Sequence, residues 1–178
     1  MRPECRYVLD NALPTSTNKL TCQFCPGSSR VVVPVDLPAD ALGIVVKFDI
    51  RDEAQGIASF QNIAAIAASF TVGGPTAALN AYAAAWRNSN NPPAISTRCT
   101  YFITTDGTAA QRWYDSQGRE VPEPAALFYV PSGNVTNETR PLPLAIPVRQ
   151  LYLCVQNDNV HTDAATTISV AAMRQRCP

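Results

Sequence analysis

Short runs of β-branched and aromatic residues, each ended by Pro, Gly, Asn or Asp, recur along most of this chain. Such runs are typical of β-strands, because these side chains pack well on a pleated surface and the intervening residues form turns. The runs expected to form strands are residues 31–35, 42–50, 65–72, 97–105, 111–114, 126–130, 144–155 and 166–173. We therefore predict an all-β fold: a two-sheet antiparallel β-sandwich, of jelly-roll or Greek-key type, with about eight or nine strands and one short helix.

Residues 42–50 and the residue after them show the clearest period of two. Three apolar side chains fall on one side and three charged side chains on the other: Val46, Phe48 and Ile50 against Lys47, Asp49 and Arg51. Successive side chains of a strand point to opposite faces of the sheet. The pattern predicts a strand with one face in the core and the other in water.

Three other segments carry distinct local signals. Gly73-Gly74-Pro75 is a break, and the alanine-rich residues 77–86 after it predict the short helix. The dipeptide Asp106-Gly107 predicts a hairpin turn, with residues 111–114 as the returning strand. Residues 65–72 also fit part of a helical period, and we favour a strand there.

The chain length of 178 residues suits one compact domain with its own core. Residues 1–30 differ from the rest, because they hold three of the six cysteines and few periodic apolar positions. We predict that residues 1–30 form an N-terminal cysteine-containing arm and that residues 31–178 form a single β-sandwich domain. Within that domain, residues 131–143 predict a long polar loop.

Charge and hydropathy argue against two classes of partner. The chain has 14 basic and 14 acidic residues, a formal net charge of zero, and lacks the basic cluster of a nucleic-acid binder. Its longest apolar run, residues 63–70, is far shorter than the ~20 residues that span a bilayer. The first residues lack the basic and apolar regions of a secretory signal. We expect no nucleic-acid partner and no membrane.

Cysteine is the most informative residue type. The spacing Cys22-x-x-Cys25 followed by Pro-Gly resembles half of a zinc site, which Cys5 and Cys177 complete if the two ends of the chain meet. The alternative is a disulfide that staples the arm, for instance from Cys5 to Cys22 or Cys25. Cys5, Cys22, Cys25 and Cys177 are thus the candidate metal ligands, with zinc as the one cofactor considered. The other two cysteines lie in expected strands and are predicted to pack in the core: Cys99 and Cys154.

Catalytic signatures are weak in this sequence. His161 is the single histidine and lies in a polar turn, so a multi-histidine metal site is excluded and no nucleophile and base pair stands out. No phosphate-binding loop or dinucleotide fingerprint occurs. We expect a non-enzymatic protein. The best local candidate for a binding surface is the run Arg112, Trp113 and Tyr114, where outward aromatic side chains would contact a sugar or a protein.

Two segments carry a resemblance to a known class of proteins. Residues 31–50 are consecutive strands, and residues 147–173 (PVRQLYLCVQNDNVHTDAATTISVAAM) place two strands around a polar turn. In this architecture the chain resembles viral and phage β-sandwich (jelly-roll) capsid or decoration (cement) proteins. The resemblance implies a structural component of a virion that forms homo-oligomers, contacts other structural proteins and is assembled in the host cytoplasm.

Two other functions are compatible with the same fold. A secreted or surface carbohydrate-binding β-sandwich module would be a monomer with several outward aromatic residues on one sheet face. A small hydrolase or isomerase would need a pocket with paired carboxylates or a histidine. The assembly state and the chemistry of the cysteines distinguish these alternatives most clearly.

Overall fold

The computed structural model describes residues 5–55, 73–87, 97–120, 125–133 and 137–178. This part of the chain contains eight strands, two α-helices and one short 3-10 helix. The strands are β1 (Arg6–Leu20), β2 (Arg30–Asp36), β3 (Gly43–Asp52), β4 (Cys99–Thr104), β5 (Ala126–Gly133), β6 (Asn137–Pro143), β7 (Gln150–Asn157) and β8 (Ala164–Arg176). The helices are η1 (Glu53–Gln55), α1 (Gly74–Arg87) and α2 (Gly107–Asp115).

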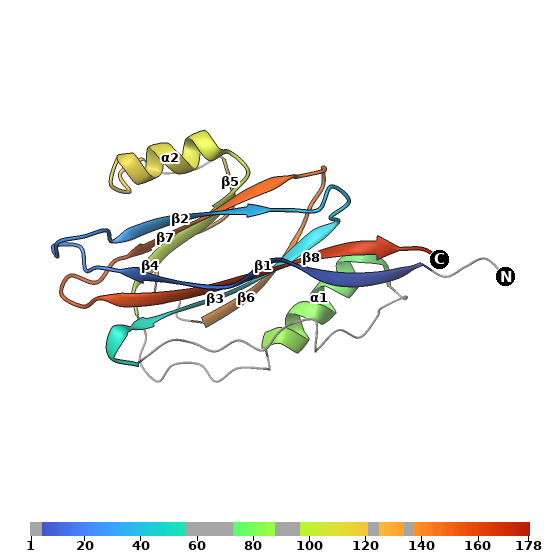
Figure 1. Cartoon of the computed structure of the whole chain (residues 1–178), viewed down its shortest axis with the longest axis horizontal. Helices are drawn as coiled ribbons and strands as arrows, with labels where there is room; N and C mark the ends of the chain where they lie inside the picture. Colours follow the sequence, from blue (N-terminus) through green and yellow to red (C-terminus); the bar gives the residue numbers. More distant parts are fainter. Residues whose placement is uncertain (1–4, 56–72, 88–96, 121–124, 134–136) are drawn as a thin grey trace.

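The strands form two four-stranded antiparallel sheets, with the orders β1-β8-β3-β6 and β2-β7-β4-β5 (Figure 1). The first strand pairs with the last, the second with the seventh, the third with the sixth and the fourth with the fifth. A chain folded back on itself in this way and then rolled into two sheets is a jelly roll. The predicted two-sheet sandwich is confirmed.

The main core lies between the two sheets. Val46, Phe48 and Ile50 point inward from β3, as their alternation predicted, and each is at most 1% exposed. Ile44, earlier in the same strand, is buried in the same core. The Phe48 ring stacks on Tyr101 of the facing sheet, with 4.6 Å between ring centroids. The predicted apolar face of β3 is therefore the core face.

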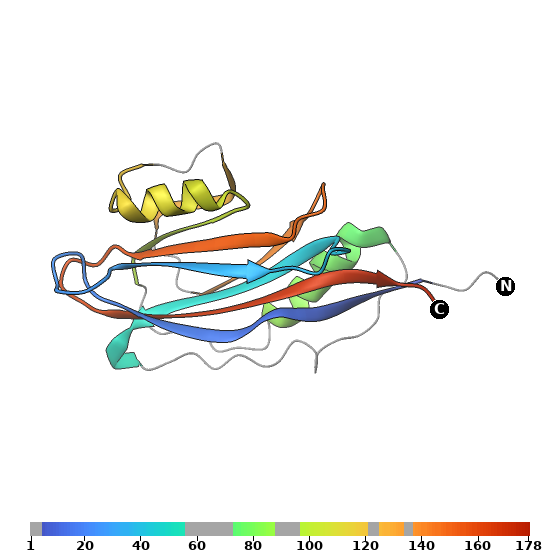
Figure 2. The same cartoon turned by 45° about the horizontal axis from the view of Figure 1, so that its top comes forward.

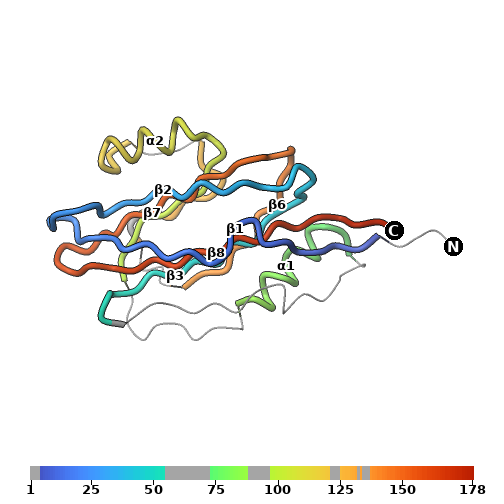
Figure 3. Tube along the Cα trace, in the orientation of Figure 1, coloured from blue at the N-terminus to red at the C-terminus, as the bar shows by residue number. Residues whose placement is uncertain are grey.

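Residues 6–20, which we expected in an arm, form the 15-residue strand β1 at the edge of the first sheet. β1 lies along β8 for its whole length, from Arg6 opposite Arg176 to Leu20 opposite Ala164 (Figure 3). Two irregularities in the register, on either side of Leu13, break its alternation of polar and apolar residues. An edge strand with such irregularities has no clean period of two, which explains why the sequence did not indicate it.

Helix α1 covers the outer face of the sheet that contains β3. Residues 77–86 are helical, as predicted, and Leu79, Tyr82 and Trp86 are buried against this sheet. Lys47 and Asp49 of β3, expected in water, have no exposed area. That expectation was wrong because the end of α1 lies against Lys47, and because the side chains of Arg51 and Asn137 donate hydrogen bonds to the Asp49 carboxylate.

Helix α2 lies on the opposite side of the sandwich from α1 (Figure 2). It replaces the hairpin that we predicted after Asp106, whose carboxylate instead accepts hydrogen bonds from the backbone N–H groups of Thr108 and Ala109. Asp106 is thus a helix N-cap, and residues 111–114 are helical rather than extended. Within the described ranges, neither helix combines the length and apolar character needed to cross a membrane.

The other boundary predictions had mixed outcomes. The strand predicted at 126–130 is confirmed and continues to Gly133, while residues 137–143 of the expected loop form β6. Pro141 and Pro143 are tolerated there because β6 is an edge strand that pairs only with β3. The strand predicted at 144–155 begins only at Gln150. The strand favoured at 65–72 lies outside the described residues.

Candidate functional site

Two loops meet at one end of the sandwich: residues 21–29 between β1 and β2, and residues 158–163 between β7 and β8. We call them together the loop tip. The buried side-chain amide of Asn157 donates hydrogen bonds to the carbonyls of Thr21 (3.1 Å) and Thr162 (2.9 Å). The backbone N–H of Gln23 donates to the carbonyl of Asn159 at 2.9 Å. These bonds hold the two loops as one unit.

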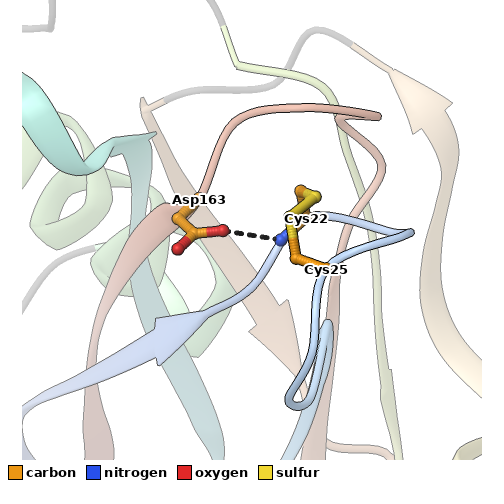
Figure 4. A group of neighbouring side chains, drawn as sticks. All are labelled: Cys22, Cys25 and Asp163. Atoms are coloured by element: carbon orange, nitrogen blue, oxygen red, sulfur yellow. Dashed lines mark hydrogen bonds between the residues drawn. A yellow bond between two sulfur atoms is a disulfide. The ribbon is translucent and has the colours of Figure 1, made fainter.

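Cys22 and Cys25 form a disulfide within the first loop, and Asp163 lies beside it on the second (Figure 4). The backbone N–H of Cys22 donates a hydrogen bond of 2.9 Å to the Asp163 carboxylate. The two sulfur atoms and a carboxylate oxygen all lie within 4.8 Å of one another. Cys22 is buried, whereas Cys25 and Asp163 are partly exposed.

The same tip exposes apolar side chains. Phe24, between the two cysteines, is 81% exposed, and Val160 on the facing loop is 41% exposed. The loop turns at Gly27, which has a φ of +121° and leaves no room for a Cβ, because the methyl group of Thr21 would lie 2.6 Å away. The tip is therefore a restrained loop that presents a phenylalanine to solvent.

The predicted four-cysteine metal site is not assembled. Cys5 forms a disulfide with Cys177, with 4.2 Å between their Cα atoms, so the two ends of the chain do meet. However, β1 separates Cys5 from Cys22, and a strand of 15 residues spans roughly 50 Å. The two disulfides therefore lie at opposite ends of the molecule, and the alternative bridges from Cys5 to Cys22 or Cys25 are likewise not formed.

The other two cysteines are core residues, as predicted. Cys99 and Cys154 are both fully buried and stand outside the disulfides. Burial raises the pKa of the Cys154 thiol to about 12, because a thiolate would lose its hydration there. Cys154 is therefore a packing residue, without the thiolate character of a reactive cysteine.

The three residues of the predicted binding run do not share one surface: Arg112, Trp113 and Tyr114. They lie on helix α2, where successive side chains point in different directions. Trp113 is only 2% exposed, because it packs edge-on against Phe102 of β4 with 5.2 Å between centroids. Arg112 is exposed, and Tyr114 is 37% exposed. Tyr114 lines a shallow depression with residues of β2, and its hydroxyl lies 3.3 Å from the Ser28 hydroxyl. Trp113 is thus part of the core and does not face a ligand.

A buried polar cluster, which the sequence did not predict, lies on the outer face of β3. The ammonium of Lys47 donates a hydrogen bond to the carbonyl of Trp86 in the last turn of α1. Desolvation lowers the pKa of Lys47 to about 8, an effect that the Asp49 carboxylate opposes. Asp49 in turn accepts two hydrogen bonds of 2.7 Å from the Arg51 guanidinium. The hydrogen bond from Lys47 to Trp86 attaches the end of α1 to the sheet.

The opposite end of the sandwich carries another exposed apolar residue. Ile146, in the connection from β6 to β7, is 69% exposed and lines a depression of about 400 Å³. Asp40 lines the same depression and forms an ion pair of 2.7 Å with Arg174 of β8, which also pairs with Asp10 at 2.8 Å. We call the connections at 37–42 and 144–149 the far end.

No protein-family model, curated protein or solved structure matches this chain.

Proposed function

We propose that this chain is a structural subunit of a virion, of capsid or decoration type, which acts through contacts with copies of itself and with other structural proteins. The observation that carries the proposal is the exposure of apolar side chains at both ends of a jelly roll whose outer faces are covered by helices. Phe24 at the loop tip is 81% exposed and Ile146 at the far end is 69% exposed. Jelly rolls recur in viral capsids.

Apolar contacts at opposite ends suit repeated assembly. The loop tip follows Asn157 and the far end precedes Gln150, so the eight residues of β7 separate them. A subunit that uses two different surfaces makes head-to-tail contacts, which close into rings when the rotation permits. Burying one phenylalanine side chain contributes about 2 kcal/mol, and an assembly gains this at every repeat.

Charge and cysteine chemistry are compatible with such a particle. The formal net charge of zero leaves little long-range repulsion between copies. The particle would assemble in the host cytoplasm, and disulfides such as Cys5–Cys177 persist at virion surfaces after release.

The secreted carbohydrate-binding module is the weaker candidate. Trp86 and Trp113 are each at most 2% exposed, because helices α1 and α2 bury them against the two sheets. Tyr114, at 37% exposed, is a poor replacement for an open aromatic platform. Trp113, the central side chain of the predicted binding run, is therefore used for packing.

Sedimentation velocity and native mass spectrometry of the full chain test the proposal. We expect a concentration-dependent assembly of several copies, which Phe24→Ser and Ile146→Ser each shift toward the monomer. The control is Leu127→Ser, which removes an exposed apolar side chain of β5 and should leave the assembly unchanged. A chain that stays monomeric at all concentrations and binds oligosaccharides in a glycan array would overturn the proposal in favour of the binding module.

A further inference from the structure

The loop tip brings together donor atoms of the kind that zinc prefers. Two sulfur atoms and one carboxylate oxygen, from Cys22, Cys25 and Asp163, lie within 4.8 Å of one another (Figure 4). Ligand atoms around a tetrahedral zinc ion are about 3.5 Å apart. When the disulfide is reduced, the two sulfur atoms must separate to non-bonded distance, which moves them toward this spacing.

We propose that the reduced loop tip binds one zinc ion through the Cys22 and Cys25 thiolates, the Asp163 carboxylate and the His161 imidazole. A cysteine pair spaced by two residues is a common half of a zinc site. Mixed sulfur, nitrogen and oxygen donors suit zinc better than the all-oxygen ligation that calcium and magnesium require. The site is independent of whether the chain assembles.

His161 is the best fourth ligand. It is exposed, stands two residues before Asp163 and lines the same depression as Cys25 and Asp163. Glu53 lines that depression too, but its carboxylate pairs with the Lys19 ammonium at 2.5 Å. Recruiting the imidazole as the fourth ligand would break no such ion pair, although in the oxidised tip it stands outside the 4.8 Å cluster of the other three ligand atoms.

Reduction of the disulfide controls the site. A small cellular thiol attacks one sulfur of the Cys22–Cys25 bond as a thiolate, which breaks that bond and forms a mixed disulfide. A second small thiol displaces the protein sulfur, so two electrons pass to the cystine and the two small thiols leave as their own disulfide. Zinc then displaces the two thiol protons as it binds. In the oxidised loop tip both sulfur atoms are in the disulfide, so no thiolate is available to bind zinc.

Cobalt(II) is a spectroscopic probe for this site. The full chain is reduced with a phosphine, desalted under argon and titrated with Co²⁺. We expect one Co²⁺ per chain, with near-ultraviolet thiolate charge-transfer bands and the visible bands of tetrahedral cobalt, all removed by Zn²⁺. The oxidised wild-type protein, which has the same sequence and fold, should take up none.

Variants separate this site from the other cysteines. Cys22→Ser/Cys25→Ser should abolish Co²⁺ uptake, whereas the matched control Cys5→Ser/Cys177→Ser should keep the wild-type affinity. Asp163→Asn and His161→Gln should each weaken Co²⁺ binding at least about tenfold, since even outer-shell partners of a metal contribute that much. Failure of the reduced wild type to bind Co²⁺, or binding that survives Cys22→Ser/Cys25→Ser, overturns the proposal. Unchanged affinity in His161→Gln overturns the assignment of the fourth ligand.

Discussion

The two outer faces of the sandwich are both covered by a helix, but the contacts beneath the helices differ. Under α2, Trp113 packs against Phe102 and the buried thiol of Cys154, and the cluster is apolar. Under α1, Val45 and Trp86 pack beside the buried ammonium of Lys47. Both helices thus cover apolar surface, and the α1 interface in addition encloses a charged group whose hydrogen-bond acceptor lies on the helix itself.

The difference has an energetic consequence. An apolar contact depends on the area removed from water and on close packing, neither of which changes with pH. A buried ammonium loses hydration, so its contribution depends on its protonation state. The packing under α2 should therefore contribute stability that does not change with pH, whereas the contribution of Lys47 under α1 should vary with pH.

The largest expected effect is at Trp113. Trp113→Ala should lower the free energy of unfolding by about 3 to 5 kcal/mol, because it leaves a cavity against Phe102. Urea unfolding measures the change, which should be the same at pH 7 and pH 9.5. Tyr114→Ala, at the exposed neighbouring position, is the control and should cost less than about 1 kcal/mol. If Tyr114→Ala lowered the free energy of unfolding as much as Trp113→Ala does, α2 would not pack on the sheet through Trp113 as described.

The second effect is due to Lys47, which should make the free energy of unfolding increase with pH. Its pKa is about 8 in the folded protein against an ordinary value of 10.5. Between these two pH values the folded state has released the proton that the unfolded state still binds, so stability increases with pH. We expect a gain of about 1 to 2 kcal/mol from pH 8 to pH 10. Lys47→Met should remove this gain in the same urea experiment, and a wild-type profile that is flat or falling would contradict the buried charge.

The smallest effect concerns the start of α2. Asp106→Ala removes the acceptor of the Thr108 and Ala109 N–H groups and should cost about 1 kcal/mol. Thermal unfolding followed by circular dichroism is sufficient to detect it. Gln111→Ala changes an exposed side chain within the same helix and should shift the midpoint little. Equal shifts in the two variants would show that the cap contributes nothing specific.

Local sequence patterns predicted those parts of the fold that local chemistry decides. The alternation at Val46, Phe48 and Ile50 identified the core face of β3, and the alanine-rich residues 77–86 identified α1. The same reasoning failed for residues 111–114, because Asp106-Gly107 is compatible with a hairpin turn and with a helix N-cap. The helix is favoured over the hairpin because it packs Trp113 against the apolar surface of Phe102 and Cys154.

For the candidate site, the sequence identified the cysteines but not their partners. It indicated Cys22 and Cys25 as a pair of potential ligands, and β1 then placed Cys5 far from both. Asp163 joins the pair only because the β7–β8 loop folds over the β1–β2 loop. No spacing in the sequence encodes a contact across 141 residues.

The sequence by itself determined the all-β class, the inward face of β3 and the alanine-rich helix, because strand and helix periods follow from backbone geometry within a few residues. Only the tertiary structure decided the strand order, the disulfide partners and the burial of Lys47 and Trp113. These features join segments that are distant in the chain, and their free energies depend on which surfaces the whole fold brings into contact.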